Sequence, residues 1–298
     1  MSTTTVALKI DVDTYAGTRD GVPKLLDILQ DFGIKATFYF SMGPDNSGKA
    51  VRRLFTRKGF LKKVLRTKAP AAYSLKTLLF GTLLPPPMIA ESFPEILLEA
   101  EKKGHETGIH CWDHVKWDDL LSWFPKPVTA MELGKAGGKF EAIFGRRART
   151  TAAPGWMLSE DSLEVQDAME LLYCSDSRGR CPFYPVVAGR TFKTLQVPTT
   201  WPTMDELLGE NGISAETIND HYLSRLSSGL HVHTIQAEME GGKLSSVFIE
   251  LLQKLVAAEV RFITLAEAAR EHAPSAPACA IEMGEIPGRA GYVALQGK

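Results

Sequence analysis

The 298-residue chain has few cysteines: there are four, and none belongs to a Cys-x-x-Cys pair. This usage is typical of a reducing compartment and argues against a disulfide framework or a zinc knuckle. Nowhere do 18 apolar residues follow one another, so no membrane-spanning helix is predicted. The N-terminus lacks a basic segment followed by a long apolar run, which predicts no signal peptide and a cytoplasmic location.

The chain also lacks an excess of one charge, because 34 Lys and Arg stand against 35 Asp and Glu. A balanced total argues against a surface devoted to nucleic acid. The balance breaks between residues 46 and 90, where basic residues lie among Leu and Phe without any Asp or Glu. We predict that this insertion binds an anionic membrane surface; a solvated basic hairpin and RNA binding are the alternatives. Its basic residues are Lys49, Arg52, Arg53, Arg57, Lys58, Lys62, Lys63, Arg66, Lys68 and Lys76.

Strand and helix patterns alternate along most of the chain, beginning with a strand at 5–15, a helix at 21–33 and a strand at 35–43. Alternation of this kind favours a parallel sheet with right-handed crossovers. Further helices are expected at 93–104, 129–145, 159–169, 215–226 and 245–259, and further strands at 105–111, 149–156, 171–176, 194–200, 230–235 and 260–268.

Seven or eight strands, most of them followed by a helix, predict a closed or nearly closed β/α barrel. A doubly wound open sheet would produce a similar pattern. Residues 276–298 show neither a helical nor a strand period, so we expect a C-terminal tail that lies on or hangs from the surface.

Two aspartates mark the end of the first predicted strand. In "KIDVD", Asp11 and Asp13 share one face while the opposite face is apolar. Burying two carboxylates costs several kcal/mol unless a cation or hydrogen bonds compensate. A bound metal ion is therefore our preferred interpretation, and an ion pair with Lys9 on the same face is the alternative.

Two histidines follow a later strand with a spacing of four residues, His110 and His114 in "HCWDH". On one turn of helix this spacing places both imidazoles on one side, as two nitrogen ligands of a divalent metal require. Together with an aspartate they complete a set of two histidines and one carboxylate, which leaves coordination positions open for water and substrate.

These motifs, with "AAPGW" at 152–156 and "CSDSRG" at 174–179, resemble the successive motifs of the polysaccharide deacetylase (NodB-homology) family over nearly the whole chain. A narrower likeness is to family members that deformylate 4-deoxy-4-formamido-L-arabinose carried on undecaprenyl phosphate. It is carried by "KIDVDTYAGTRDGVPKLL", "SMGPDN", the basic insertion, "CWDH", "SDSRG" and "AEMEG".

The resemblance implies a distorted β/α barrel of about seven strands over residues 1–275 and a metal-dependent hydrolysis of an amide. It implies Asp11 as general base and Asp13, His110 and His114 as ligands of a divalent metal, with zinc first and manganese or cobalt as alternatives. The implied substrate-binding residues are Tyr15, Trp156, Asp176, Arg178 and Glu238.

The implied partners are a lipid-linked sugar phosphate and the anionic inner face of a bacterial inner membrane, without nucleic acid or an obligate protein partner. The free amino sugar produced would go on to modify lipid A and confer polymyxin resistance. The family arginine that orients the base has no equivalent in "TTAAPGW", and Arg178 is the candidate to replace it.

The largest departure concerns Gln236, which stands where these relatives carry a histidine as general acid. Strand alternation places His231 and His233 on the face opposite to Gln236, so neither substitutes for that acid without a register slip. A glutamine amide forms hydrogen bonds but delivers no proton at neutral pH. The residue is then either a natural variant with weakened turnover or an engineered substitution that retains substrate. A chitin- or peptidoglycan-type N-deacetylase and a sugar-binding pseudoenzyme are the competing functions.

Overall fold

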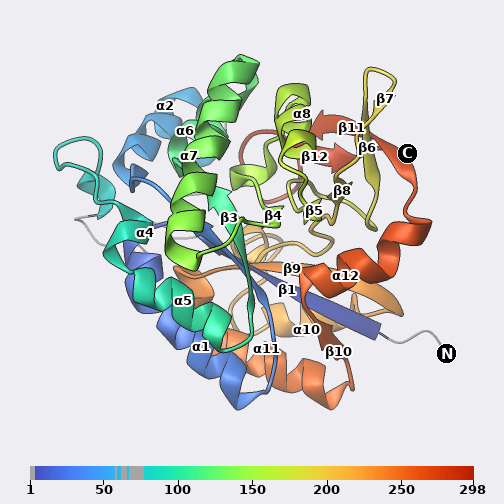
Figure 1. The fold of residues 1–298 in the computed structure, drawn as a ribbon. Coiled ribbons are helices and arrows are strands. Elements are labelled where there is room, and N and C mark those ends of the chain that lie inside the picture. Colours follow the sequence, from blue (N-terminus) through green and yellow to red (C-terminus); the bar gives the residue numbers. More distant parts are fainter. Residues whose placement is uncertain (1–3, 58, 62–65, 67–76) are drawn as a thin grey trace.

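A parallel sheet of eight strands forms the centre of the computed structural model, which describes residues 4–57, 59–61, 66 and 77–298 (Figure 1). The strands follow the order β10-β1-β2-β3-β4-β5-β8, and β9 pairs with β1. Their bounds are β1 (Thr4–Val12), β2 (Thr37–Ser41), β3 (Glu106–Cys111), β4 (Thr150–Thr151), β5 (Tyr173–Cys174), β8 (Leu195–Gln196), β9 (Gly229–Gln236) and β10 (Arg261–Ile263).

Helices surround this sheet, with α1, α5 and α11 lying side by side along its lower left in Figure 1 and α7 at its upper left. Their bounds are α1 (Val22–Asp31), α2 (Arg53–Thr56), α4 (Ile89–Ser92), α5 (Pro94–Lys102), α6 (His114–Leu120), α7 (Lys126–Phe144), α8 (Glu160–Ala168), α9 (Met204–Leu207), α10 (Ile218–Leu223), α11 (Ser245–Ala257) and α12 (Leu265–His272). None of the helices in the described ranges is both long and apolar enough to cross a lipid bilayer.

Strand β1 organises the barrel because it pairs in parallel with three others, β9 along residues 4–11, β2 along 9–12 and β10 along 5–7. Its alternate residues serve two layers. Leu8 and Ile10 pack with the buried faces of the helices, whereas Ala7 packs with Tyr39 and Tyr173 in a second cluster. This second cluster fills the barrel interior below the carboxyl ends of the strands.

The barrel is distorted where β8 and β9 should meet, because no strand ladder joins them. Instead, the amides of Thr200 and Trp201 donate to the carbonyl of Val232 at 3.0 and 3.1 Å. The predicted distorted β/α barrel is confirmed, and its eight strands agree with the seven or eight counted from the sequence.

Several predicted strands are shorter than their sequence patterns, and the segments 171–176 and 194–200 contain only the two-residue strands β5 and β8. The segment 149–156 contains only β4, after which the chain turns at Pro154–Trp156. The segment 260–268 ends as a strand at Ile263, because Thr264 and Glu267 form a capping box that starts α12. The sequence therefore contained a helix-start signal, Thr-x-x-Glu, but the apolar residues before it led us to predict a strand through residue 268.

The C-terminal segment forms regular structure, contrary to the expectation of a tail without strands. Strands β11 (Ala278–Gly284) and β12 (Val293–Gln296) join β6 (Tyr184–Val187) and β7 (Arg190–Thr191) in a second sheet of order β12-β11-β6-β7. Val293 and Ala294 are fully buried. The period was missed because β12 has only four residues and β11 is largely exposed, so that its apolar and polar residues do not alternate.

Candidate metal centre

Three of the predicted ligands meet at the carboxyl ends of the strands. Asp13 follows β1, His110 lies near the end of β3, and His114 is the first residue of α6. Their ligand atoms all lie within 4.8 Å of one another. Nε2 of His110 is 3.1 Å from Oδ1 of Asp13, and Nε2 of His114 is 3.6 Å from Oδ2 of the same carboxylate.

The two histidines do not share a helical turn, which corrects the geometry expected from their spacing. His110 belongs to a strand, and α6 begins only at His114, with Asp113 as its N-cap accepting a hydrogen bond from the amide of Lys116. The bend between strand and helix brings the imidazole rings to 5.3 Å between centroids.

Buried ligand atoms without partners fit a cation at this place. Oδ1 of Asp13 and both ring nitrogens of His110 are buried and accept or donate no hydrogen bond to any described residue. Leaving such groups unsatisfied is costly. Burial would raise the pKa of Asp13, yet His114 and then His110 bring it down to about 2, so the carboxylate is ionised. Burial lowers the pKa of His114, which favours the neutral, ligating imidazole.

Asp11 stands beside this group and is held by a buried lysine. Nζ of Lys9 lies 3.5 Å from Oδ2 of Asp11 and donates to the carbonyl of Ser175 at 2.9 Å. The other oxygen of Asp11 lies 3.9 Å from Nδ1 of His110. The alternative to a metal ion was an ion pair with Lys9. That ion pair is present, but it involves Asp11 and leaves Asp13 to the candidate ligand group.

Lys9 also takes the place that we gave to Arg178. Both Nη1 contacts of Arg178 go to Glu206, at 2.7 and 3.0 Å, and its Nη2 donates to the carbonyl of Trp201. The hydrogen bonds of Arg178 thus go to Glu206 and Trp201, and among the described residues Lys9 is the basic side chain in contact with Asp11. The sequence carried this signal, since Lys9 and Asp11 share one face of β1.

Glu238 fixes the loop that carries Asp13. Its Oε1 accepts hydrogen bonds from the amides of Asp13 and Thr14 at 3.1 and 2.8 Å, and from the hydroxyl of Thr14 at 2.7 Å. A Cβ on Gly17 would lie 2.0 Å from this oxygen, so only glycine allows the close approach. Glu238, expected to bind substrate, is in this structure an anchor of the metal-site loop.

Asp176, another expected substrate contact, is enclosed by protein. It has no exposed surface and accepts hydrogen bonds from the amide of Ala153 at 2.6 Å and from Gln166 at 2.7 Å. Burial lowers the pKa of Lys9, and the nearby negative charge of Asp176 opposes this larger effect by raising the pKa of that lysine. The ring of Tyr15 packs on Phe93, with 4.6 Å between centroids, and remains half-buried.

Gln236 ends β9 directly beside Asp11, its neighbour in the parallel register. Neighbours in a parallel ladder point to the same side of the sheet, so Gln236 faces the site. Among the described residues its side-chain amide has no hydrogen-bond partner, and it is half-buried. His233 pairs with Leu8 in the helix-facing layer, where it packs on Trp201 and Tyr222. The alternation of this strand is as predicted.

The amino-acid sequence is similar to a known protein family and to individual proteins of known name. The sequence model described as "Polysaccharide deacetylase" matches residues 1–174. A probable 4-deoxy-4-formamido-L-arabinose-phosphoundecaprenol deformylase of Shewanella sediminis is 37% identical over 98% of this chain and 95% of its own. A protein of the same name from Wigglesworthia glossinidia brevipalpis is 32% identical over 95% and 99%.

The fold has a solved counterpart in a candidate polysaccharide deacetylase from Mycobacterium smegmatis, with a TM-score of 0.66, 16% identity and 96% coverage of both chains. At this identity the likeness concerns the fold alone. The fold and the family together define an α/β amide hydrolase, with a candidate metal-binding group of residues at the mouth of a distorted barrel. The chain belongs to the polysaccharide deacetylase family.

Proposed function

We propose that this protein is a metal-dependent deformylase that hydrolyses the formamido group of 4-deoxy-4-formamido-L-arabinose linked to undecaprenyl phosphate. The observation that carries the proposal is the buried group of Asp13, His110 and His114 with Asp11 at its side. Two curated relatives over nearly the full chain bear the name of this activity, which favours it over a glycan N-deacetylase.

A divalent cation bound by Asp13, His110 and His114 would supply Lewis acidity to the amide carbonyl. Zinc is our first choice, and manganese and cobalt are alternatives with the same ligand types. Asp11 accepts a proton from the attacking water, and Lys9 keeps its carboxylate oriented toward the site. The proton that Asp11 has taken from water is the one available to the departing nitrogen, so the C–N bond of the formamide breaks as this nitrogen gains it, and formate and a free amine leave. Gln236 can hydrogen-bond to the sugar amide but offers it no acidic proton.

Three of the basic residues expected to contact the membrane form ion pairs within the protein instead. Arg53 and Arg57 form ion pairs with Asp118 at 2.9 and 3.1 Å, and Arg66 pairs with Glu210 at 3.1 Å. These three arginines fasten the insertion to the barrel and are not free for lipid. Lys58, Lys62, Lys63, Lys68 and Lys76 lie outside the described residues.

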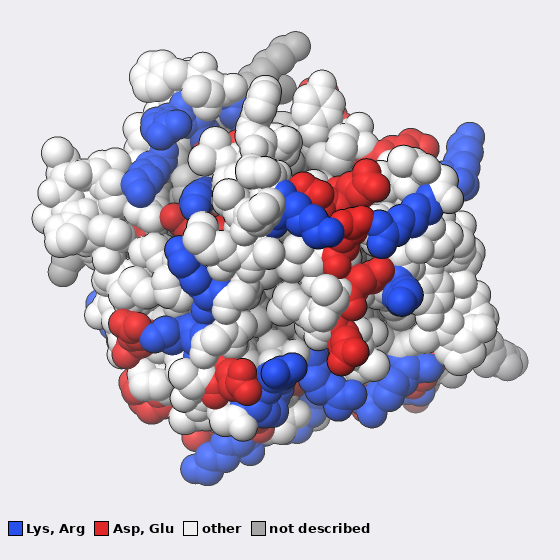
Figure 2. Space-filling model, turned by 45° about the horizontal axis from the view of Figure 1, so that its top comes forward, with Lys and Arg blue, Asp and Glu red and all other residues white. Residues whose placement is uncertain are grey.

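Exposed apolar side chains within the insertion and next to it support peripheral binding at the inner face of the membrane. Phe55 is 89% exposed and Leu83 is 81% exposed. Trp123, which follows α6, is 82% exposed, and α6 packs against the start of the insertion. Figure 2 shows uncharged projections beside Lys and Arg at the upper left of the molecule. Aromatic side chains with nearby cations are typical of interfacial anchors.

The test is an assay of formate release from the lipid-linked formamido sugar, with zinc, manganese or cobalt added to metal-free protein. An N-acetylglucosamine oligomer serves as the competing substrate. Because Gln236 weakens proton delivery, the Gln236→His variant is assayed in parallel. Release of acetate but not formate would replace the proposal by an N-deacetylase, and tight sugar binding without turnover by either protein would indicate a pseudoenzyme.

A further inference from the structure

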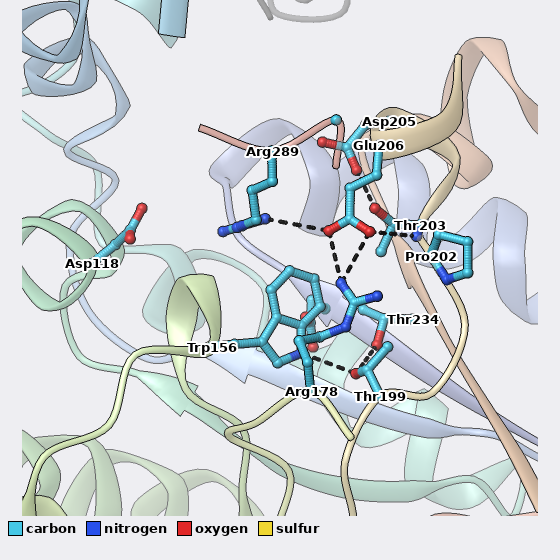
Figure 3. Close-up of polar contacts among 12 residues, drawn as sticks. Asp118, Trp156, Arg178, Thr199, Pro202, Thr203, Asp205, Glu206, Thr234 and Arg289 are labelled. Atoms are coloured by element: carbon cyan, nitrogen blue, oxygen red, sulfur yellow. Dashed lines mark hydrogen bonds and ion pairs between the residues drawn. The ribbon is translucent and has the colours of Figure 1, made fainter. Parts of the chain in front are cut away.

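A tryptophan and two arginines from distant parts of the chain form a compact group next to the metal centre (Figure 3). The guanidinium of Arg178 lies 4.7 Å from the ring centroid of Trp156, and that of Arg289 lies 4.6 Å from it. Arg289 comes from the loop between β11 and β12. Arg178 and Arg289 both lie beyond residues 1–174, the part that the family's sequence model matches.

Arg289 differs from Arg178 because none of its guanidinium nitrogens forms a hydrogen bond with a described residue, whereas Arg178 donates to Glu206 and Trp201. Its Nη1 is 3.9 Å from Oε1 of Glu206, which is too long for a hydrogen bond. Within the described part of the chain its guanidinium donates no hydrogen bond, although its side chain is only 12% exposed. Arg178, in contrast, binds both oxygens of Glu206. A guanidinium has five donors, and those of Arg289 are available to an acceptor that enters the site.

The group borders the proposed chemistry. Nζ of Lys9, the partner of Asp11, is 5.4 Å from the ring centroid of Trp156. On the other side of Arg289 lies Asp118, as Figure 3 shows. Asp118 belongs to α6, the helix that starts with the ligand His114. An anion bound at Arg289 would therefore lie close to an amide held between Asp11 and the metal ligands.

The backbone that carries Trp156 is strained to place the indole there. Gly155 and Trp156 have φ angles of +66° and +53°, and a bulky residue in this region is rare. The indole is fixed by a hydrogen bond from Nε1 to Thr199 at 2.9 Å, and Thr199 in turn contacts Thr234 at 2.7 Å. A Cβ on Gly155 would lie 2.4 Å from Asp118 and 3.2 Å from Arg289. The turn thus makes room for the arginine.

We propose that Arg289, positioned over Trp156, binds the phosphodiester that joins the sugar to its lipid carrier. This inference rests on the proposed function and assigns the substrate's phosphate to a residue of the C-terminal segment. A planar guanidinium matches phosphate oxygens in a two-pronged geometry. In the substrate, one pentose ring separates the formamido carbon from the carbon that bears the phosphate, so the phosphate must bind within about one sugar ring of the metal ligands.

Other nearby cations are already satisfied. Lys9 is occupied by Asp11 and Ser175, and Arg53 by Asp118 and Asp119. Arg66 donates to the carbonyls of residues 205, 206, 208 and 288. The last of these contacts holds the backbone just before Arg289. A phosphate in this site would therefore accept hydrogen bonds from the unpaired N–H groups of Arg289.

The experiment compares two substrates: the polyprenyl phosphate-linked formamido sugar and the methyl glycoside of the same sugar, which has no phosphate. In Arg289→Gln, kcat/KM for the phosphate-linked substrate should fall roughly 10- to 150-fold, the range for a hydrogen bond to a charged group. Most of this loss should appear as a higher KM. The preference of the enzyme for the phosphate-linked substrate over the methyl glycoside should fall by the same factor. Arg289→Lys should recover part of the lost kcat/KM. Arg190→Gln, an exposed arginine paired with Glu164 on α8, is the matched control and should change neither rate.

A second measurement is the binding of a short-chain polyprenyl phosphate without sugar, which Arg289→Gln should weaken while metal content stays the same. Equal losses on both substrates would overturn the proposal, as would undiminished binding of the lipid phosphate. If Arg289→Gln does not fold, the same readouts in Arg289→Lys decide. Absence of formate release from either substrate by the unchanged chain and by Gln236→His would refute the proposed function itself.

Discussion

Gln236 and Asp11 are direct neighbours in the parallel register of β9 and β1, and both side chains face the mouth of the barrel. A side chain that replaced Gln236 would therefore lie beside the proposed base and on the side of the metal ligands. This relationship makes position 236 the most informative place to alter the chemistry.

We predict that Gln236→His raises deformylase turnover by roughly 10²–10⁴, the usual contribution of one positioned proton donor, with little change in metal content. The gain should decline as pH rises, because only the protonated imidazole acts as an acid. Formate release as a function of pH measures both effects. The matched control is His233→Ala on the opposite face. Abolished activity in that control, or equal turnover with glutamine and histidine, would mean that this strand presents its other face to the substrate.

The ligand assignment predicts a split between metal content and activity. Asp13→Ala, His110→Ala and His114→Ala should each lose bound metal, because each removes one of three ligand groups. Asp11→Asn should retain the metal and lose activity, because the amide cannot accept the proton of the attacking water. Elemental analysis of the purified variants, followed by the formate assay, separates these outcomes. Comparable metal loss in Asp11→Asn would assign Asp11 to the ligands.

Lys9 should act as a positioning residue for Asp11. Lys9→Met removes the cation 3.5 Å from the Asp11 carboxylate and should lower kcat roughly 10- to 100-fold with a small change in KM. Lys9→Arg keeps the charge and should retain more activity. Unfolding in denaturant should show a loss of about 3–5 kcal/mol for Lys9→Met, because a buried carboxylate is left unpaired. A drop in stability alone, with kcat intact, would make Lys9 a purely structural residue.

Membrane binding should depend on the exposed apolar side chains within the insertion and next to it. The triple change Phe55→Ala, Leu83→Ala and Trp123→Ala should reduce co-sedimentation with anionic vesicles, because these side chains are 81–89% exposed.

The matched control changes three exposed apolar residues on other helices, Leu98→Ala, Met131→Ala and Val256→Ala. Replacing Arg53 or Arg57 by Gln should instead destabilise the fold, since both pair with Asp118. Equal vesicle binding by the two triple variants would leave the insertion as a solvated basic segment.

His233 should make the protein less stable in acid. Burial, followed by the charge of Arg178, lowers the pKa of His233 to about 3 from an ordinary value of 6.5. The unfolded chain therefore binds a proton that the folded chain does not, and stability should fall as pH drops from about 6.5 toward 3.

His233→Leu keeps much of the packing volume against Tyr222 and should flatten this dependence, which denaturant unfolding at pH 7 and pH 4.5 measures. His233→Ala should cost several kcal/mol at both values, in the range of about 2–5 kcal/mol for emptying a buried site. An unchanged pH dependence in His233→Leu would show that this imidazole is protonated in the folded protein.

The sequence by itself determined the features that depend on local periodicity. Alternation along β1 and β9 established which residues face the site, because side chains of a strand point to opposite sides in turn. The repeated order of strand and helix indicated a β/α barrel, because the two elements have different hydrophobic periods that the sequence shows directly. Residue chemistry indicated the candidate ligand types, two histidines and a carboxylate, and the family resemblance singled out Asp13.

Only the tertiary structure decided the pairings between distant segments. His110 and His114 meet through a bend between β3 and α6, not through a helical turn. Lys9 rather than Arg178 reaches Asp11, and Arg289 from the C-terminal segment reaches Trp156. The contact between Trp156 and Arg289 joins residues more than 100 positions apart, and no local pattern encodes it, because packing of the barrel creates it. The Lys9–Asp11 pair, in contrast, lies on one face of β1 and was available from the alternation of that strand.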